Sequence, residues 1–212
     1  MRALPKTDIY AITDSTLSLG RPVEEVVGAL LGAGVKIIQY REKKKKAGEM
    51  LRECEILRTM TRDAGAFFIV NDHIDIAMLV KADGVHVGQE DLPVGRVREL
   101  VGDDCCIGFS THSPEQVAEA VRVGADYIGV GPLYATQTKE DVCNPVGLEY
   151  LDYVAASQAI PFVVIGGIKR HNIAEVVRHG GRCCCLVSEL VGAPEIAARV
   201  AEVRAIMKGQ GA

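Results

Sequence analysis

The stretch ADYIGVGPLYATQTK, from Ala125 to Lys139, places an apolar segment directly before a polar loop. Its first part, Ala125 to Val130, is rich in apolar and β-branched residues, which is typical of a strand buried on both faces in a parallel sheet. A Gly-Pro pair ends this strand. The loop beyond it then offers two hydroxyls and an ammonium, which either hold an anion such as phosphate or belong to an ordinary solvated loop, at Thr136, Thr138 and Lys139.

Similar apolar segments alternate with stretches of helical periodicity along the whole chain, which is the pattern of repeated βα units. We expect eight strands, at residues 9–13, 35–40, 67–70, 84–87, 105–109, 127–130, 162–165 and 183–187. A helix should follow each strand, and helical spacing is clearest at residues 23–31, 50–64, 115–123, 173–178 and 195–207. Eight units without a Pro-, Gly- or Ser-rich linker favour an α/β fold, a single-domain (β/α)₈ TIM barrel over residues 1–212. An open doubly wound sheet is the alternative.

Signals for both ends surround the expected helix at residues 115–123. Ser113 is the expected N-cap, Pro114 falls in the first turn, Gln116 would complete a capping box, and Gly124 follows the end.

The composition is that of an ordinary globular chain, with 212 residues, 48% hydrophobic residues and a formal net charge of −4. Such a charge gives no reason to expect nucleic acid as a partner, so we expect small substrates. No long apolar run and no charged-then-apolar leader precedes the first expected strand, so we expect no membrane association and a cytoplasmic location. Whether the chain forms a homo-oligomer is left open.

Five of the seven cysteines lie in two apolar runs, at residues 105–106 and 183–185. Because adjacent residues of a strand point to opposite faces, these cysteines cannot form the C-x-x-C geometry of a zinc site. We expect them to be small buried hydrophobic residues.

Polar residues alternate at the expected end of the second strand. Gln39, Arg41 and Lys43 project to one side while the strand continues, and they would present an amide and two cations to a single site. Arg41 could offer a planar fork to phosphate oxygens and Lys43 a mobile charge, which suits a diphosphate. A strand end that frays into a charged loop is the alternative, since lysines continue to Lys46.

Carboxylates follow the next two strands. Asn71 and Asp72 come after the third strand and Asp91 after the fourth, so neighbouring strand ends should bring them together. Two carboxylates beside a diphosphate are a usual way to hold Mg²⁺. Caps of the following helices are an equally good interpretation of these residues.

Two further turns suggest a phosphate site. Gly166 and Gly167 follow the seventh strand, and Val187 and Ser188 follow the eighth. Backbone N–H groups after these two strands form the phosphate site of many barrels, although a Gly-Gly pair is also a plain turn.

The chain resembles the thiamin-phosphate synthase family over nearly its whole length and in the family's order. The resemblance rests on QYREK at 39–43, NDHIDIA at 71–77, ADGVHVGQED at 82–91, GFSTH at 108–112, GVGPLYATQTK at 129–139, IGGI at 165–168 and LVS at 186–188. It implies that hydroxymethylpyrimidine diphosphate is coupled with thiazole phosphate, with Mg²⁺ as cofactor, to give thiamin phosphate. Diphosphate would depart first and leave a pyrimidine carbocation, which the thiazole nitrogen captures.

The resemblance also implies a role for each matched residue. Those that match pyrimidine diphosphate contacts are Gln39, Tyr40, Arg41, Glu42, Lys43, Asn71 and Lys139, of which Arg41, Lys43 and Lys139 would act on the departing diphosphate. Thr136, Gln137 and Thr138 match thiazole phosphate contacts, and Gly167, Val187 and Ser188 form the expected phosphate site. Ser110 matches a substrate-binding serine after the fifth strand, His86 lies near the pyrimidine, and Asp72 and Asp91 match the metal ligands.

Two other functions remain open. One is that of a thiazole tautomerase, a related barrel that aromatises the thiazole without coupling it, although the intact QYREK and TQTK motifs count against it. The other is that of a non-catalytic paralogue that binds a precursor and regulates.

Overall fold

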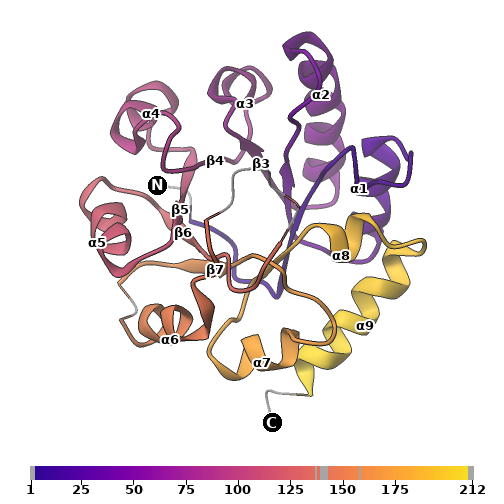
Figure 1. Cartoon of the computed structure of the whole chain (residues 1–212). Coiled ribbons are helices and arrows are strands. Elements are labelled where there is room, and N and C mark those ends of the chain that lie inside the picture. Colours follow the sequence, from indigo (N-terminus) through magenta and orange to yellow (C-terminus); the bar gives the residue numbers. More distant parts are fainter. Residues whose placement is uncertain (1–2, 137, 139–142, 158, 210–212) are drawn as a thin grey trace.

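Eight parallel strands close into a barrel in the order β1 to β8, and helices surround it (Figure 1). The computed structural model describes residues 3–136, 138, 143–157 and 159–209. The strands are β1 Ile9–Ile12, β2 Ile37–Tyr40, β3 Phe67–Asn71, β4 Gly84–Val87, β5 Cys106–Thr111, β6 Tyr127–Val130, β7 Phe162–Val164 and β8 Cys184–Leu186. The pairing of β8 with β1 closes the sheet, which confirms the predicted barrel and excludes the open sheet.

A helix follows every strand, as predicted, and a further one completes the chain. The helices are α1 Val23–Gly32, α2 Ala47–Asp63, α3 Ile74–Val80, α4 Val94–Val101, α5 Pro114–Arg122, α6 Gly147–Ser157, α7 Ile173–Arg178, α8 Ser188–Val191 and α9 Ile196–Lys208. In the described part of the chain, no helix is both long and apolar enough to cross a membrane.

The strands separate two apolar clusters, because successive side chains point to opposite faces of the sheet. In β1, Ile9 and Ala11 belong to the cluster beneath the helices, whereas Tyr10 and Ile12 belong to a second cluster. The hydroxyl of Tyr10 contacts that of Tyr127 on β6. Since β1 and β6 are not neighbours in the sheet, this contact crosses the barrel, and the second cluster is therefore the barrel interior.

The cysteines follow the same alternation. Cys184 lies beneath the helices, while Cys183 and Cys185 lie in the barrel interior. All seven cysteines are free, and all but Cys143 are buried. The expectation of small buried hydrophobic residues is confirmed for the two runs, and burial raises the pKa of Cys183 to about 12.

β5 extends two residues beyond its predicted end at residue 109. Ser110 pairs with Gly129 of β6 and Thr111 with Val130, so the hydrogen-bonded ladder continues to Thr111. The predicted strand end at residue 109 and the placement of Ser110 after the strand were therefore wrong. Thr111 is fully buried, and its hydroxyl donates to the carbonyl of Gly129.

The ends of α5 follow the predicted signals in part. The Ser113 hydroxyl accepts from the backbone N–H of Gln116 at 3.4 Å, and Gly124 after the helix has a φ of +78°. The Gln116 side chain accepts from the N–H of His112 at 2.7 Å. In a capping box it would accept from Ser113 itself, so the reciprocal half of that prediction was wrong by one residue.

Candidate functional site

The polar residues predicted from the sequence lie at the carboxyl ends of the strands. In a parallel barrel all these ends meet at one rim, which is where barrel active sites are built. Arg41 and Lys43 follow β2, Asp72 follows β3, Thr136 follows β6 and Ser188 follows β8. One rim therefore carries all of these groups.

Both cations after β2 are held by carboxylates from neighbouring segments. Arg41 Nη1 donates to Asp14 Oδ2 at 2.9 Å, and the Arg41 N–H donates to the Thr13 hydroxyl at 3.0 Å. Lys43 Nζ lies 2.5 Å from Asp72 Oδ2, so it reaches across to the segment after β3. Asp14 accepts from one nitrogen of the Arg41 guanidinium, and the other two have no hydrogen-bond partner among the described residues, so they could bind an anion.

Tyr40 and Glu42 turn away from this pair. The Tyr40 hydroxyl donates to Glu53 of α2 at 2.6 Å, and the Glu42 carboxylate accepts from the backbone N–H groups of Lys43 and Lys44 at 2.7 and 2.8 Å. Burial and the neighbouring Glu53 raise the pKa of Tyr40 above its ordinary value. Together with Arg41, these two residues line a cavity of about 290 Å³ between the segments after β1 and β2.

A chain of hydrogen bonds crosses the barrel interior beneath the rim. Gln39 Nε2 donates to the Tyr10 hydroxyl at 2.7 Å, and the Tyr10 and Tyr127 hydroxyls lie 2.9 Å apart. The Tyr127 hydroxyl lies 3.0 Å from His86 Nδ1, and His86 Nε2 lies 3.0 Å from the Ser110 hydroxyl. The chain ends at Ser110, which lies near the end of β5.

The direction of this chain follows from counting donors and acceptors. Burial raises the pKa of both Tyr10 and Tyr127 well above the ordinary value, so each is a neutral phenol with one proton. Among the described residues, Tyr10 has only Gln39, a donor, and Tyr127 as partners. Tyr10 therefore donates to Tyr127, and Tyr127 donates to His86 Nδ1. His86 must then carry its proton on Nε2 and donate to Ser110, which leaves the Ser110 hydroxyl proton free for another group.

Gly108 makes room for this chain. A Cβ atom at Gly108 would lie 2.2 Å from Tyr127 Cζ and 2.4 Å from His86 Nδ1, which no side chain could accommodate without a shift. Gly108 pairs with both His86 and Tyr127 in the sheet, so the two rings meet directly above its backbone.

The carboxylates after β3 and β4 do not cap the helices that follow them. The N-cap of α3 is His73 and that of α4 is Pro93, and neither helix start has a side-chain capping hydrogen bond within the described residues. Asn71 is the last residue of β3, and Asp72 has a φ of +60°, a conformation that few non-glycine residues adopt. The capping interpretation left open by the sequence is thereby excluded for Asp72 and Asp91.

Asp72 and Asp91 fit a magnesium site in their chemistry. Asp72 Oδ2 binds Lys43, and Asp91 Oδ2 accepts from the N–H of Gly88 at 2.7 Å. Oδ1 of each carboxylate has no donor among the described residues, and Mg²⁺ commonly takes one or two carboxylates together with water and phosphate oxygens. The described residues contain no group of three or more His, Cys, Asp or Glu side chains suited to a metal.

The segments after β6 and β7 pack tightly against each other. Tyr134 donates its N–H to the carbonyl of Gly166 at 3.0 Å, and a Cβ at Gly167 would lie 2.7 Å from the carbonyl oxygen of Ala135. Gly167 also has a φ of +63°, so a glycine is favoured there on both grounds. Thr136 comes directly after Ala135, and its hydroxyl lies 3.2 Å from that of Thr138.

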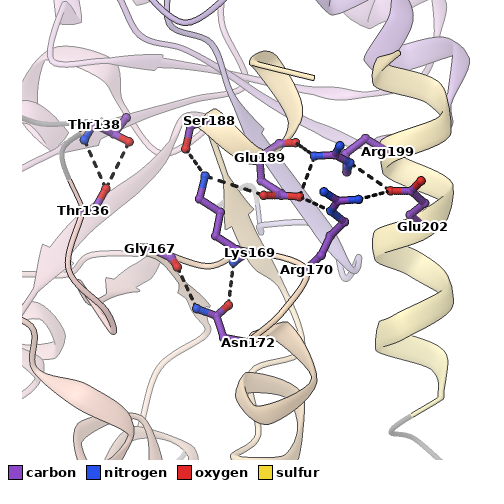
Figure 2. A network of polar contacts seen from close by, with 10 residues as sticks. All are labelled: Thr136, Thr138, Gly167, Lys169, Arg170, Asn172, Ser188, Glu189, Arg199 and Glu202. Carbon is purple, nitrogen blue, oxygen red and sulfur yellow. Dashed lines mark hydrogen bonds and ion pairs between the residues drawn. The ribbon is translucent and has the colours of Figure 1, made fainter. Parts of the chain in front are cut away.

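A hydrogen bond joins the segment after β8 to the segment after β7, as Figure 2 shows. Ser188 is the first residue of α8 and Val187 precedes it. Lys169, two residues beyond Gly167, donates from Nζ to the Ser188 hydroxyl at 2.6 Å. Asn172 fixes the turn from Gly167 to Lys169. Its side chain accepts from the N–H of Lys169 at 2.7 Å and donates to the carbonyl of Gly167 at 3.0 Å.

Two predicted residues, Gln137 and Lys139, lie outside the described residues. The assignments of Gln137 and Lys139 therefore stay predictions.

Sequence reasoning missed four residues of this rim and interior. Asp14 was not considered as the partner of Arg41, although an acid just after the first strand is a signal that could have been used. Tyr10 and Tyr127 were counted as apolar strand residues, because a sequence does not show which side chains meet across a barrel. Lys169 was not singled out, since its contact with Ser188 depends on the turn fixed by Asn172.

Comparison with known proteins gives matches over the same length. The thiamine monophosphate synthase family matches residues 9–190. The thiamine-phosphate synthase of Lawsonia intracellularis is 60% identical over 197 residues, which are 93% of this chain and 91% of the relative. That of Pelotomaculum thermopropionicum is 58% identical over 207 residues, or 98% of this chain and 95% of the relative. A solved structure of a thiamine phosphate pyrophosphorylase from Pyrococcus furiosus is 36% identical and superposes with a TM-score of 0.87 over 97% of both chains.

Proposed function

The chain belongs to the thiamine monophosphate synthase family, a family of transferases in thiamine biosynthesis, and we propose that it couples hydroxymethylpyrimidine diphosphate with thiazole phosphate in the cytoplasm. The observation that supports this proposal is that two groups of side chains with the chemistry to bind an anion lie on one rim. Arg41 and Lys43 form the first, and the hydroxyls of Thr136, Thr138 and Ser188 belong to the second. A coupling enzyme needs both groups, because each substrate brings its own phosphate.

In the proposed reaction, the bond between the pyrimidine methylene carbon and the diphosphate oxygen breaks first, and its electron pair leaves with diphosphate. The thiazole nitrogen then donates its lone pair to the methylene carbon, which forms the new C–N bond of thiamin phosphate. Arg41 and Lys43 stabilise the negative charge that develops on the departing oxygen. Their ion pairs with Asp14 and Asp72 hold the two cations in place before the substrate binds.

Asp72 and Asp91 are the residues that would hold Mg²⁺ here. Bound Mg²⁺ would neutralise part of the diphosphate charge and make it a better leaving group. Lys43 also binds Asp72, so its ammonium and the metal would act on the same end of the substrate.

Ser110 and the interior hydrogen-bond chain would face the pyrimidine ring. Because His86 donates from Nε2, the Ser110 hydroxyl keeps its own proton to donate to a ring nitrogen or another acceptor. The chain beneath it is made of neutral groups, so it can orient the ring without placing a charge next to the developing carbocation.

Separate binding of the two substrates tests this proposal. Isothermal titration calorimetry with a non-hydrolysable pyrimidine diphosphate analogue and with thiazole phosphate should show one site for each. Thr138→Ala should weaken thiazole phosphate by about fivefold, through a lost hydroxyl contact of about 1 kcal/mol, and leave the pyrimidine ligand unchanged. Binding of thiazole phosphate alone would favour a tautomerase. Binding of both ligands, with no thiamin phosphate formed when hydroxymethylpyrimidine diphosphate replaces the analogue, would favour a regulator.

A further inference from the structure

A cluster of five charged side chains lies beside the proposed phosphate site (Figure 2). We call it the Glu189 cluster. It contains three cations and two carboxylates, namely Lys169, Arg170, Arg199, Glu189 and Glu202. Three positive charges against two negative charges leave the cluster with one surplus positive charge.

The two arginines of the Glu189 cluster neutralise its two carboxylates, because each arginine binds both of them. Arg170 binds both Glu189 and Glu202 at 2.9 Å. Arg199 also binds both carboxylates, at 2.8 Å to Glu189 and 3.1 Å to Glu202. Glu189 is buried, so its charge needs these partners, and both arginines meet it at the same oxygen, Oε1.

Lys169 is the one cation of the Glu189 cluster that makes no hydrogen bond to either carboxylate. Its Nζ lies 3.8 Å from Glu189 Oε2, which is beyond hydrogen-bond distance, and its hydrogen bond goes to the Ser188 hydroxyl instead. An ammonium has three protons, so two remain for another acceptor. The Lys169 side chain is 33% exposed, which leaves it accessible to a ligand.

The Ser188 hydroxyl is oriented by the same contact. Because the ammonium has only protons to offer, Ser188 must accept from it, and the proton of Ser188 is then free to point elsewhere. An anion beside this pair would receive one hydrogen bond from Ser188 and at least one from Lys169. The hydrogen bond from the charged ammonium of Lys169 would be the stronger of the two.

We propose that Lys169 binds the phosphate group of the thiazole substrate together with Ser188, and that it supplies the full positive charge of this site. The other described residues assigned to the site, Thr136, Thr138, Gly167, Val187 and Ser188, are all uncharged. The identity of the ligand rests on the proposed function, whereas the recognition of a phosphate by the Lys169–Ser188 pair does not. The turn held by Asn172 keeps the lysine in place.

Calorimetry with thiazole phosphate and with the corresponding unphosphorylated thiazole alcohol tests the assignment. Lys169→Met should weaken thiazole phosphate by roughly tenfold or more, as expected for the loss of a charged hydrogen bond, and should leave the alcohol unchanged. Lys169→Arg should retain most of the affinity. Lys208→Met is the matched control, because it removes the same charge from an exposed position in the last turn of α9.

Equal binding of thiazole phosphate by the parent and by Lys169→Met would overturn the proposal, even if the protein couples its substrates. If the parent does not bind thiazole phosphate at all, the proposed function fails, and inorganic phosphate then decides the role of Lys169. Titration of inorganic phosphate should shift the amide NMR signals of Ser188 and Gly167 in the parent, and Lys169→Met should reduce these shifts severalfold. Unchanged shifts in the variant would again overturn the proposal.

Discussion

Removal of the Tyr127 hydroxyl should break the hydrogen-bond chain inside the barrel at its centre. Tyr127→Phe keeps the ring but deletes an atom that lies 2.9 Å from the Tyr10 hydroxyl and 3.0 Å from His86 Nδ1. Tyr10 is buried, so its proton would lose its acceptor without gaining a water molecule. Two lost bonds, one of which leaves a buried donor unpaired, correspond to about 1–3 kcal/mol of unfolding free energy.

Urea unfolding measures this loss directly. At an m-value of about 2–3 kcal/mol per M, a loss of about 2 kcal/mol lowers the unfolding midpoint by roughly 0.7–1 M. Nitrogen-15 NMR of the histidine side chains provides the second measurement. The parent should show His86 protonated on Nε2 alone, and the variant should show a larger share of the Nδ1-protonated tautomer, because Nδ1 no longer accepts from Tyr127.

Tyr153→Phe provides the control, since Tyr153 is 46% exposed and should tolerate loss of its hydroxyl with little change. If the parent carries the His86 proton on Nδ1, the chain runs in the opposite direction and the assignment of donors and acceptors is wrong. An unfolding midpoint that is the same for Tyr127→Phe and the parent would show that the chain contributes nothing to stability.

Three further predictions concern the rim and the thiols. Arg41→Lys keeps the charge but loses the planar fork, and kcat for coupling should fall at least tenfold; turnover equal to the parent would make Lys43 the better candidate. Excess chelator should abolish coupling and added Mg²⁺ restore it, while Asp91→Asn should lose turnover with its melting temperature unchanged; full activity in chelator would remove the metal from the account. A thiol reagent at pH 8 should modify Cys143 alone in the folded protein, because the other six cysteines are buried. Burial raises the pKa of Cys54, for example, to about 12, which keeps its thiol in the unreactive protonated form. Rapid labelling of a second cysteine would contradict this prediction.

The barrel itself could be predicted because its strands are buried on both faces and each is followed by a helical pattern. Strand ends were less predictable, since β5 continues to Thr111 only because β6 offers Val130 as a partner. The start of α2 shows the same limit. It begins at Ala47, three residues before its predicted start, because its first three residues are exposed and the first buried apolar residue of the helix is Met50.

The rim could also be predicted in outline, because polar residues at strand ends converge wherever parallel strands close into a barrel. What the sequence could not show is which of these residues bind one another. Lys43 binds Asp72 and Lys169 binds Ser188, and these pairs join separate strands through side chains whose direction depends on the local turns. Strand alternation did separate Gln39, which turns into the barrel, from Tyr40, which turns toward α2, but it could not show that Gln39 donates to Tyr10 in the interior.

Formation of thiamin phosphate by the purified protein is the decisive test of the proposed coupling activity. The protein should be incubated with Mg²⁺ and hydroxymethylpyrimidine diphosphate, thiazole phosphate or both, and the product detected as its fluorescent thiochrome derivative. Product formation is expected only when both substrates are present, with one diphosphate released for each thiamin phosphate formed. Absence of product with both substrates present, while the protein remains folded and binds them, would contradict it.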